Sequence, residues 1–219
     1  MDKFTLLTTG AVALEADNID TDQIMPKQFL RGIDKSGLDK GLFYNLKHKA
    51  DGSLYPKCVL NSPAAAKAAV LLAGPNFGCG SSREHAVWGL LQGGFRVVVA
   101  PSFGEIFYSN CFNNGLLACK VSVDDLEKLF DVLRKDPQAV FTVDLAARTV
   151  CTGDIFVSFA IAPRHSRMLE LGLDMVDTTL SEIDEVKRFR EQHEREFPWM
   201  SGLPGKAKRV LVARGESLP

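Results

Sequence analysis

The sequence predicts a mixed α/β domain, and three observations support this fold class. Runs of β-branched and aliphatic residues, most of them short and bounded by Gly, Pro, Asn or Asp, alternate with helical stretches between residues 69 and 161. The 219 residues are 46% hydrophobic and 24% charged, which is typical of a folded globular protein. Where a helix connects two strands, parallel pairing is favoured, because the crossover returns the chain to the same edge of the sheet.

Seven strands are expected along the chain, at 4–7, 12–14, 69–73, 95–100, 116–121, 140–145 and 155–161. Ser122 and Asp125 have the spacing of a helix cap, which predicts a helix that runs to Lys135 and ends before Pro137. A charged amphipathic pattern predicts another helix over 181–197.

We expect a single domain over residues 1–200. Within it, residues 1–65 are rich in turn residues and are interpreted as loops laid over a scaffold, which is where specificity often lies. The mixed α/β core is expected over 66–180, and the amphipathic helix follows it. Residues 201–219 are interpreted as a tail.

The composition disfavours several classes of protein. Lys and Arg number 26 against 27 Asp and Glu, so no excess of positive charge indicates binding to nucleic acid or to an anionic membrane. No stretch approaches the ~20 apolar residues that a membrane-spanning helix needs, and the first residues lack a secretory signal, so a cytoplasmic location is expected. The cysteines include no closely spaced pair, which argues against disulfides, a zinc site or an iron–sulfur cluster held by this chain; they are Cys58, Cys79, Cys111, Cys119 and Cys151.

Most of the chemical signal lies in one segment, NFGCGSSREHAVWGLLQGGFRVVVAPSFGEIF. Gly78 and Gly80 permit backbone conformations that other residues avoid. Ser81 and Glu84 follow with an S-x-x-E spacing, which predicts a helix N-terminus. Free backbone N–H groups at a helix start attract anions, and Arg83 adds a planar fork suited to a carboxylate or phosphate. The segment therefore predicts an anion-binding turn that carries hydroxyl groups.

Simpler interpretations exist for each of these residues. Ser81 would serve as a plain helix cap that accepts a bond from the N–H of Glu84. A structural phosphate-binding turn would have the same composition. The segment lacks the endings of a Walker loop and of a nucleophile elbow. His85 is interpreted as a buried histidine without a catalytic role, and Cys79 as a packing thiol.

The motif GCGSSREHA, followed by FRVVVAPSFGEIFYSNCFNNGLL, resembles the small subunit of 3-isopropylmalate dehydratase, a family of the aconitase superfamily. NIDTDQIMPKQF, upstream, resembles the N-terminal loop of that family, and Gly172-Leu-Asp174 resembles its closing segment. The similarity spans residues 4 to 190. It implies a swivelling β/β/α domain, equivalent to the C-terminal domain of aconitase, that closes over a cluster-bearing partner.

The resemblance also implies roles for single residues. Ser81 would be the catalytic base, with its ionised form stabilised by backbone N–H groups and Arg83. Ser82 and Arg83 would contact a substrate carboxylate, and Thr21 is expected at the same site. Asp22 would orient a proton-transfer group supplied by the partner, although an Asx turn is the simpler interpretation, and a Mg²⁺ ligand a weaker one. Arg31 is either a contact to a second substrate carboxylate or a surface charge.

The resemblance implies a hydro-lyase that isomerises 2-isopropylmalate and 3-isopropylmalate in leucine biosynthesis. A 4Fe–4S cluster on a large subunit would supply the Lewis acid, this chain would bind no metal, and activity would need the heterodimer or heterotetramer. Related subunits that act on citraconate/2-methylmalate, on maleate or on homoaconitate are alternatives. A non-catalytic anion-binding module is a further alternative, and the balanced charge disfavours RNA binding.

Overall fold

The structure is a computed structural model of the chain, and it describes residues 1–30, 36–200, 202, 203 and 205. Arg31 lies outside the described residues, so its predicted role has no structural counterpart here. By compactness the chain divides after Met175 into two units. The expected boundaries at residues 65, 180 and 200 stay predictions.

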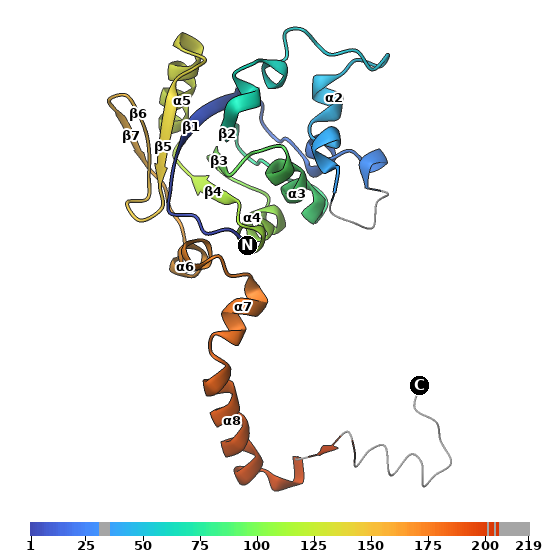
Figure 1. Cartoon of the computed structure of the whole chain (residues 1–219), viewed down its shortest axis with the longest axis vertical. Coiled ribbons are helices and arrows are strands. Elements are labelled where there is room, and N and C mark those ends of the chain that lie inside the picture. Colours follow the sequence, from blue (N-terminus) through green and yellow to red (C-terminus); the bar gives the residue numbers. More distant parts are fainter. Residues whose placement is uncertain (31–35, 201, 204, 206–219) are drawn as a thin grey trace. The chain divides into compact units, whose positions relative to one another are not determined.

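A seven-stranded mixed sheet forms the centre of the first unit (Figure 1). Its strand order is β4-β3-β2-β1-β5-β6-β7. The four strands from β4 to β1 are parallel to one another, and β1, β5, β6 and β7 pair antiparallel in succession. The strands are β1 Leu6–Leu14, β2 Ala68–Ala73, β3 Val97–Ala100, β4 Leu117–Lys120, β5 Val140–Asp144, β6 Thr149–Thr152 and β7 Ile155–Ser158.

Strand β1 joins the two halves of the sheet. Its first half, from Leu6 to Gly10, pairs antiparallel with β5, and its second half, from Gly10 to Leu14, pairs parallel with β2. The register with β2 shifts between Gly10 and Ala11. An irregularity of this kind bends a strand, and a glycine inside a strand often marks such a site.

Helices cover both faces of the parallel half. Figure 1 shows α3 and α4 on one side of strands β1 to β3 and α5 on the other. Helix α5 packs across β1, β2, β3 and β7, and α3 packs against α4. Every residue of β3 is fully buried, as expected for a parallel strand covered on both faces. These helices are α3 Glu84–Gln92, α4 Glu105–Asn114, α5 Val123–Lys135 and α6 Pro163–Leu171.

Short helices, rather than strands, fill the segment between β1 and β2. The 3-10 helix η2 (Leu38–Gly41) packs against α3, and α1 (Thr21–Ile24) also contacts α3. These short elements therefore lie on the side of the parallel half of the sheet that α3 covers (Figure 1). The elements are α1 Thr21–Ile24, η1 Lys27–Phe29, η2 Leu38–Gly41, α2 Tyr44–Lys47, η3 Val59–Asn61 and η4 Ala65–Lys67.

The predicted strands are confirmed with two differences. The strands predicted at 4–7 and 12–14 are one strand, because the intervening residues stay extended and the hydroxyl groups of Thr8 and Thr142 make a 3.0 Å cross-strand contact. The sequence did not predict β6, a four-residue strand between two turns. The helix predicted after Ser122 is α5, and the Ser122 side chain accepts a hydrogen bond from the N–H of Asp125 as expected.

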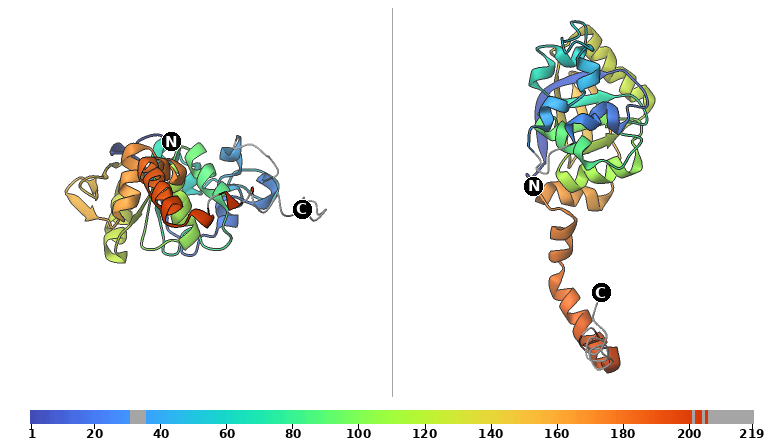
Figure 2. Two further views of the ribbon diagram at one scale, coloured as in Figure 1. Left: turned by 90° about the horizontal axis from the view of Figure 1, so that it is seen from below. Right: turned by 90° about the vertical axis from the view of Figure 1, so that its right-hand side faces the viewer.

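The second unit begins at Val176, just inside α7 (Met175–Leu180). Helix α8 (Ile183–Glu196) is the long orange helix of Figures 1 and 2, and η5 (Pro198–Met200) follows it. No helix in the described ranges is long and apolar enough to cross a membrane.

A histidine of α6 packs against α4 in the first unit. The ring of His165 stacks on Phe112 at 4.1 Å between centroids, and its Nδ1 is buried without a hydrogen-bond partner among the described residues. Burial lowers the pKa of His165 below its ordinary value, and the nearby charges of Arg164 and Lys120 lower it further. The folded chain therefore disfavours the imidazolium form.

This packing predicts a pH-dependent contribution to stability. Because the folded pKa of His165 lies below the unfolded value of about 6.5, the unfolded chain binds more protons as the pH falls through that value, so His165 disfavours folding at acidic pH and not above pH 7. His165→Phe keeps the stacked ring and removes the titration. Urea unfolding from pH 5 to pH 8 should show a smaller loss of unfolding free energy on acidification for the variant than for the wild type. Equal pH dependences would contradict the prediction.

Candidate active site

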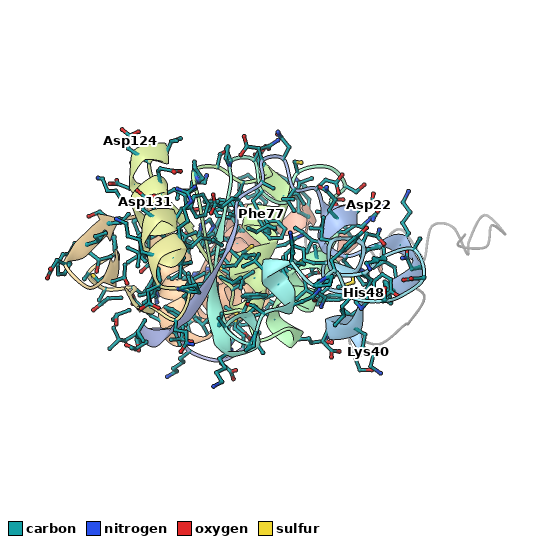
Figure 3. The ribbon with its side chains drawn as sticks, turned by 90° about the horizontal axis from the view of Figure 1, so that it is seen from above. Asp22, Lys40, His48, Phe77, Asp124 and Asp131 are labelled. Atoms are coloured by element: carbon teal, nitrogen blue, oxygen red, sulfur yellow. The ribbon has the colours of Figure 1, made fainter. Side chains whose placement is uncertain are left out.

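The predicted site residues lie where three parallel strands end. The chain leaves β1 into residues 18–22, leaves β2 into residues 75–83, and leaves β3 into residues 102–104. Because the carboxyl ends of parallel strands meet at one edge of a sheet, the three segments converge there. Figure 3 shows Asp22 on one side of this view and the α5 residue Asp131 on the other, with Phe77 between them.

The first two segments are joined by backbone hydrogen bonds. Asn18 N–H donates to the Pro75 carbonyl at 2.9 Å, and Gly78 N–H donates to the Ile19 carbonyl at 2.7 Å. Thr21 N–H then donates to the Cys79 carbonyl at 2.9 Å. The two segments therefore run side by side like a short parallel ladder, although some 60 residues of chain separate them.

The third segment supports the second from the other side. Phe77 N–H donates to the Ser102 carbonyl at 3.1 Å, and Gly104 N–H donates to the Phe77 carbonyl at 2.9 Å. Gly78 has a φ of +72°, and a Cβ there would lie 2.3 Å from Cγ of the Phe107 ring. A side chain at this position would therefore be strained twice, by its backbone conformation and by contact with Phe107.

Helix α1 positions the acidic residue of the site. Asp20 caps it, because its Oδ1 accepts from Gln23 N–H at 2.7 Å while the Gln23 side chain accepts from Asp20 N–H at 2.9 Å. The capped turn directs Asp22 toward Arg83, whose Nη1 donates to the Asp22 carboxylate. The Arg83 side chain is 17% exposed and that of Asp22 is 43% exposed, so the ion pair lies at the surface of the site.

The guanidinium of Arg83 keeps donors available. Its hydrogen bond to Asp22 uses Nη1, and Nε and Nη2 make no hydrogen bond to any described residue. A planar fork with free N–H groups suits the bidentate binding of a carboxylate. Asp22 therefore orients Arg83 without saturating it.

Ser81 is not the helix cap that the S-x-x-E spacing predicts. Helix α3 begins at Glu84, Arg83 occupies the N-cap position, and no side chain caps the helix. The Glu84 carboxylate instead accepts a hydrogen bond from Asn114 Nδ2 at 2.7 Å. Arg83 N–H donates to the Ser81 carbonyl at 2.8 Å, which closes a tight turn before the helix. The simpler interpretation of Ser81 as a cap is therefore wrong.

Both serines of the motif are exposed. Neither the Ser81 nor the Ser82 hydroxyl makes a hydrogen bond within the described chain, so both are available to a ligand. Thr21 differs from them, because it is 1% exposed and its Oγ1 donates to the Ser81 carbonyl at 3.0 Å. A direct contact of Thr21 with substrate stays a prediction.

Other residues of the segment have structural contacts. The His85 ring lies 4.7 Å from the Trp88 ring, and the half-buried Cys79 Sγ lies 3.5 Å from the Asn18 carbonyl. Sequence reasoning missed the pairing of Asn76 Nδ2 with Asn18 Oδ1 at 2.8 Å, which braces two segments of the site. Both asparagines have positive φ, of 60° and 55°. Asparagine tolerates that conformation better than most residues, but this tendency alone does not pair two distant positions.

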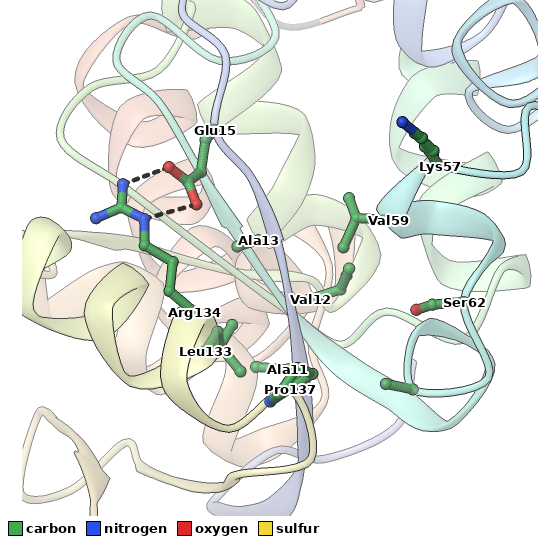
Figure 4. A pocket seen from close by; sticks show the side chains of 11 residues that line it. Ala11, Val12, Ala13, Glu15, Lys57, Val59, Ser62, Leu133, Arg134 and Pro137 are labelled. Atoms are coloured by element: carbon green, nitrogen blue, oxygen red, sulfur yellow. Dashed lines mark hydrogen bonds and ion pairs between the residues drawn. The ribbon is translucent and has the colours of Figure 1, made fainter.

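The described residues contain no group of three or more His, Cys, Asp or Glu side chains that would hold a metal ion. The cavity shown in Figure 4 is separate from the predicted site residues. It has a volume of about 360 Å³ and lies between β1, the end of α5 and residues 57–64. Arg134 borders it and forms a bidentate ion pair with Glu15.

Comparison with known proteins agrees with this architecture. Residues 1–123 match the family described as the aconitase C-terminal domain. The 3-isopropylmalate dehydratase small subunit 1 of Chromobacterium violaceum is 46% identical over 202 residues, which are 92% of this chain and 95% of that protein. The 3-isopropylmalate dehydratase small subunit of Azorhizobium caulinodans is 46% identical over 201 residues, 91% of this chain and all of that protein.

A solved structure shows the same fold. The crystal structure of 3-isopropylmalate dehydratase from Methanocaldococcus jannaschii superposes with a TM-score of 0.62 and covers 84% of this chain and 99% of its own, at 23% sequence identity. The chain is therefore a domain of the aconitase C-terminal type, as the sequence predicted. Within that class it belongs to the family of 3-isopropylmalate dehydratase small subunits.

The crowding at Gly78 predicts a large stability cost for a single methyl group. Gly78→Ala should lose about 1–2 kcal/mol from the left-handed backbone and about 1–3 kcal/mol from contact with Phe107. Gly153→Ala is the matched control, because Gly153 also has positive φ but a Cβ there would meet nothing within 4 Å. Chemical denaturation should show a clearly larger loss for Gly78→Ala. Equal losses would mean that Phe107 moves aside freely.

Proposed function

We propose that the chain is the small subunit of a heteromeric hydro-lyase that interconverts 2-isopropylmalate and 3-isopropylmalate in leucine biosynthesis. One observation supports this most strongly. Asp22, Ser81 and Arg83 come together at the carboxyl edge of the sheet in a chain that is 46% identical to small subunits of that name. The identity covers almost the whole of those relatives, so it is not limited to a shared fold.

The reaction needs a base and a means of binding carboxylates. Dehydration removes a proton from the carbon next to a carboxylate and expels hydroxide, and rehydration reverses both steps. Ser81 would accept and return that proton at its Oγ. A serine hydroxyl is a weak acid, so its ionised form needs positive charge and N–H donors close by. Arg83 and the first N–H groups of α3, which follow Ser81 within a few residues, are candidates for that support.

Substrate binding would use the groups that the fold leaves free. The unused Nε and Nη2 of Arg83 would bind one carboxylate, with the Ser82 hydroxyl beside them. Asp22 would hold Arg83 in place and orient a proton-transfer group of the partner. Arg31 remains a proposed substrate contact. Thr21, expected from the sequence to bind substrate, is 1% exposed and donates its hydroxyl to the Ser81 carbonyl, so we place it beside the substrate site as a support of the Ser81 loop.

The remaining chemistry would come from a large subunit. A 4Fe–4S cluster on that partner would supply the Lewis acid when the two chains assemble, and this chain would hold no cluster. The expected assembly is a heterodimer or heterotetramer in the cytoplasm. The names of the relatives favour isopropylmalate over citraconate, maleate and homoaconitate as the substrate.

An anaerobic assay of the reconstituted enzyme tests this proposal. The chain is mixed with its cluster-loaded large subunit, and the alkene absorbance is followed in parallel. It should rise with 3-isopropylmalate or 2-methylmalate, which are dehydrated, and fall with maleate or homoaconitate, which are hydrated. Turnover is expected only in the mixture and fastest with 3-isopropylmalate. Preference for another diacid would assign the chain to that branch of the superfamily. No turnover from a formed complex with an intact cluster would favour a non-catalytic anion-binding module.

The role of Ser81 predicts a specific kinetic effect. Ser81→Ala should lower kcat by about 10²- to 10⁴-fold, because the proton acceptor is lost. The exposed hydroxyl makes no contact within the described chain, so stability and subunit association should stay unchanged. Ser158→Ala, at an exposed position of β7, is the matched control and should keep wild-type kinetics. A near-normal kcat for Ser81→Ala would refute its assignment as the base.

A further inference from the structure

We propose that Thr21 is a positioning residue that fixes the backbone of Ser81 in one orientation. The inference rests on the proposed function, since it concerns the residue proposed as the base. Thr21 is 1% exposed and belongs to a small group of buried polar residues in the described chain, with Thr152 and Ser166. A buried hydroxyl needs a partner, and the partner of Thr21 lies in the catalytic loop.

The contact acts on a single carbonyl group. Thr21 Oγ1 donates to the Ser81 carbonyl at 3.0 Å, and Arg83 N–H donates to the same oxygen at 2.8 Å. One donor lies in the segment after β1 and the other lies two residues beyond Ser81. With both bonds made, the Ser81 carbonyl has little freedom to rotate. The chain has no cis peptide bond in its described part, so the N–H of Ser82 points away from that carbonyl. Fixing the Ser81 carbonyl therefore also fixes the direction of the Ser82 N–H.

Thr21 is itself held firmly. Its N–H donates to the Cys79 carbonyl at 2.9 Å, and its own carbonyl accepts from Met25 N–H at 2.9 Å. A β-branched side chain has few rotamers, so a fixed backbone also fixes the hydroxyl.

The carbonyl of Ser81 is held by the fold, whereas its side chain is left free for the proposed reaction. The Ser81 side chain is exposed and unpaired within the described residues, whereas its carbonyl is held from the buried side by Thr21. The ion pair of Arg83 with Asp22 restrains the far end of the loop and does not replace a bond to the Ser81 peptide. Loss of the Thr21 hydroxyl would thus allow this peptide to rotate while the fold stays intact. Small displacements of a reacting group lower the rate steeply.

Two variants and a control isolate the hydroxyl. Thr21→Val has nearly the same shape and lacks the donor, whereas Thr21→Ser keeps the donor. Thr152→Val makes the same change at another buried threonine, in β6 on the antiparallel side of the sheet. Thr21→Ala replaces Thr21→Val if valine does not fold, since alanine makes no demand on space.

The first measurement uses the full chain without its partner. Amide hydrogen exchange is followed at Arg83, whose N–H donates to the Ser81 carbonyl. Loss of a hydrogen bond to that carbonyl should raise the exchange rate about tenfold in Thr21→Val. Thr21→Ser and Thr152→Val should stay close to the wild type. An unchanged rate in Thr21→Val, or an equal rise in Thr152→Val, would overturn the proposal.

The second measurement is turnover with the cluster-bearing partner. Thr21→Val should lower kcat about 10- to 100-fold with KM within about threefold, because the base is misplaced while the carboxylate-binding groups remain. Thr21→Ser should restore kcat. Faster exchange with an unchanged kcat, or a loss that appears only in KM, would overturn the positioning role. If the wild-type complex has no turnover, the proposed function fails, and the exchange rates alone decide whether Thr21 fixes the Ser81 backbone.

Discussion

The site depends on the backbone pairing between residues 18–21 and 75–79. Three hydrogen bonds, from the N–H groups of Asn18, Thr21 and Gly78, align the segment after β1 with the segment after β2. This alignment brings Asp22 and Arg83, which are 61 residues apart in the sequence, close enough to form their ion pair. The pairing follows from the parallel order of β1 and β2, because both strands deliver their next residues to the same edge of the sheet.

Close packing limits which residues fit in the segments that converge at this edge of the sheet. Segment 102–104 occupies the other side of the second segment, and a Cβ on Gly104 would lie 2.4 Å from the Gly78 carbonyl oxygen. Gly104 is therefore required by close contact, and Gly78 both by close contact and by its positive φ. An anion-binding turn needs N–H groups that face outward, and that need usually explains such glycines. Here the crowded interior explains Gly78, whereas Gly80 allows the loop to turn outward toward Ser81.

Short sequence patterns predict much of the fold, but they predict the arrangement of the site only in part. Alternating apolar runs predicted six of the strands, because strand periodicity is visible in the sequence alone. They did not reveal β6, whose four residues lie between turns, or the continuity of β1 through Gly10. The simpler interpretation of Ser81 as a cap was wrong, because a tight turn closed by Arg83 N–H on the Ser81 carbonyl puts Arg83 at the N-cap position. The burial of Thr21 likewise depends on a distant loop, and no short window of sequence contains that information.

The candidate site combines exposed hydroxyl groups with buried hydrogen-bond donors, and this combination has a physical basis. A serine in the role proposed for Ser81 must be reachable by the substrate, yet an exposed loop has many conformations and loses entropy whenever it is ordered for reaction. Hydrogen bonds to the Ser81 carbonyl order the loop when the chain folds. They come from the buried Thr21 hydroxyl and from the Arg83 N–H of the turn itself. The exposed hydroxyls of Ser81 and Ser82 then present a preorganised surface to whatever covers this edge. Such a surface suits a site that is completed by a second chain, because association need not order the loop again.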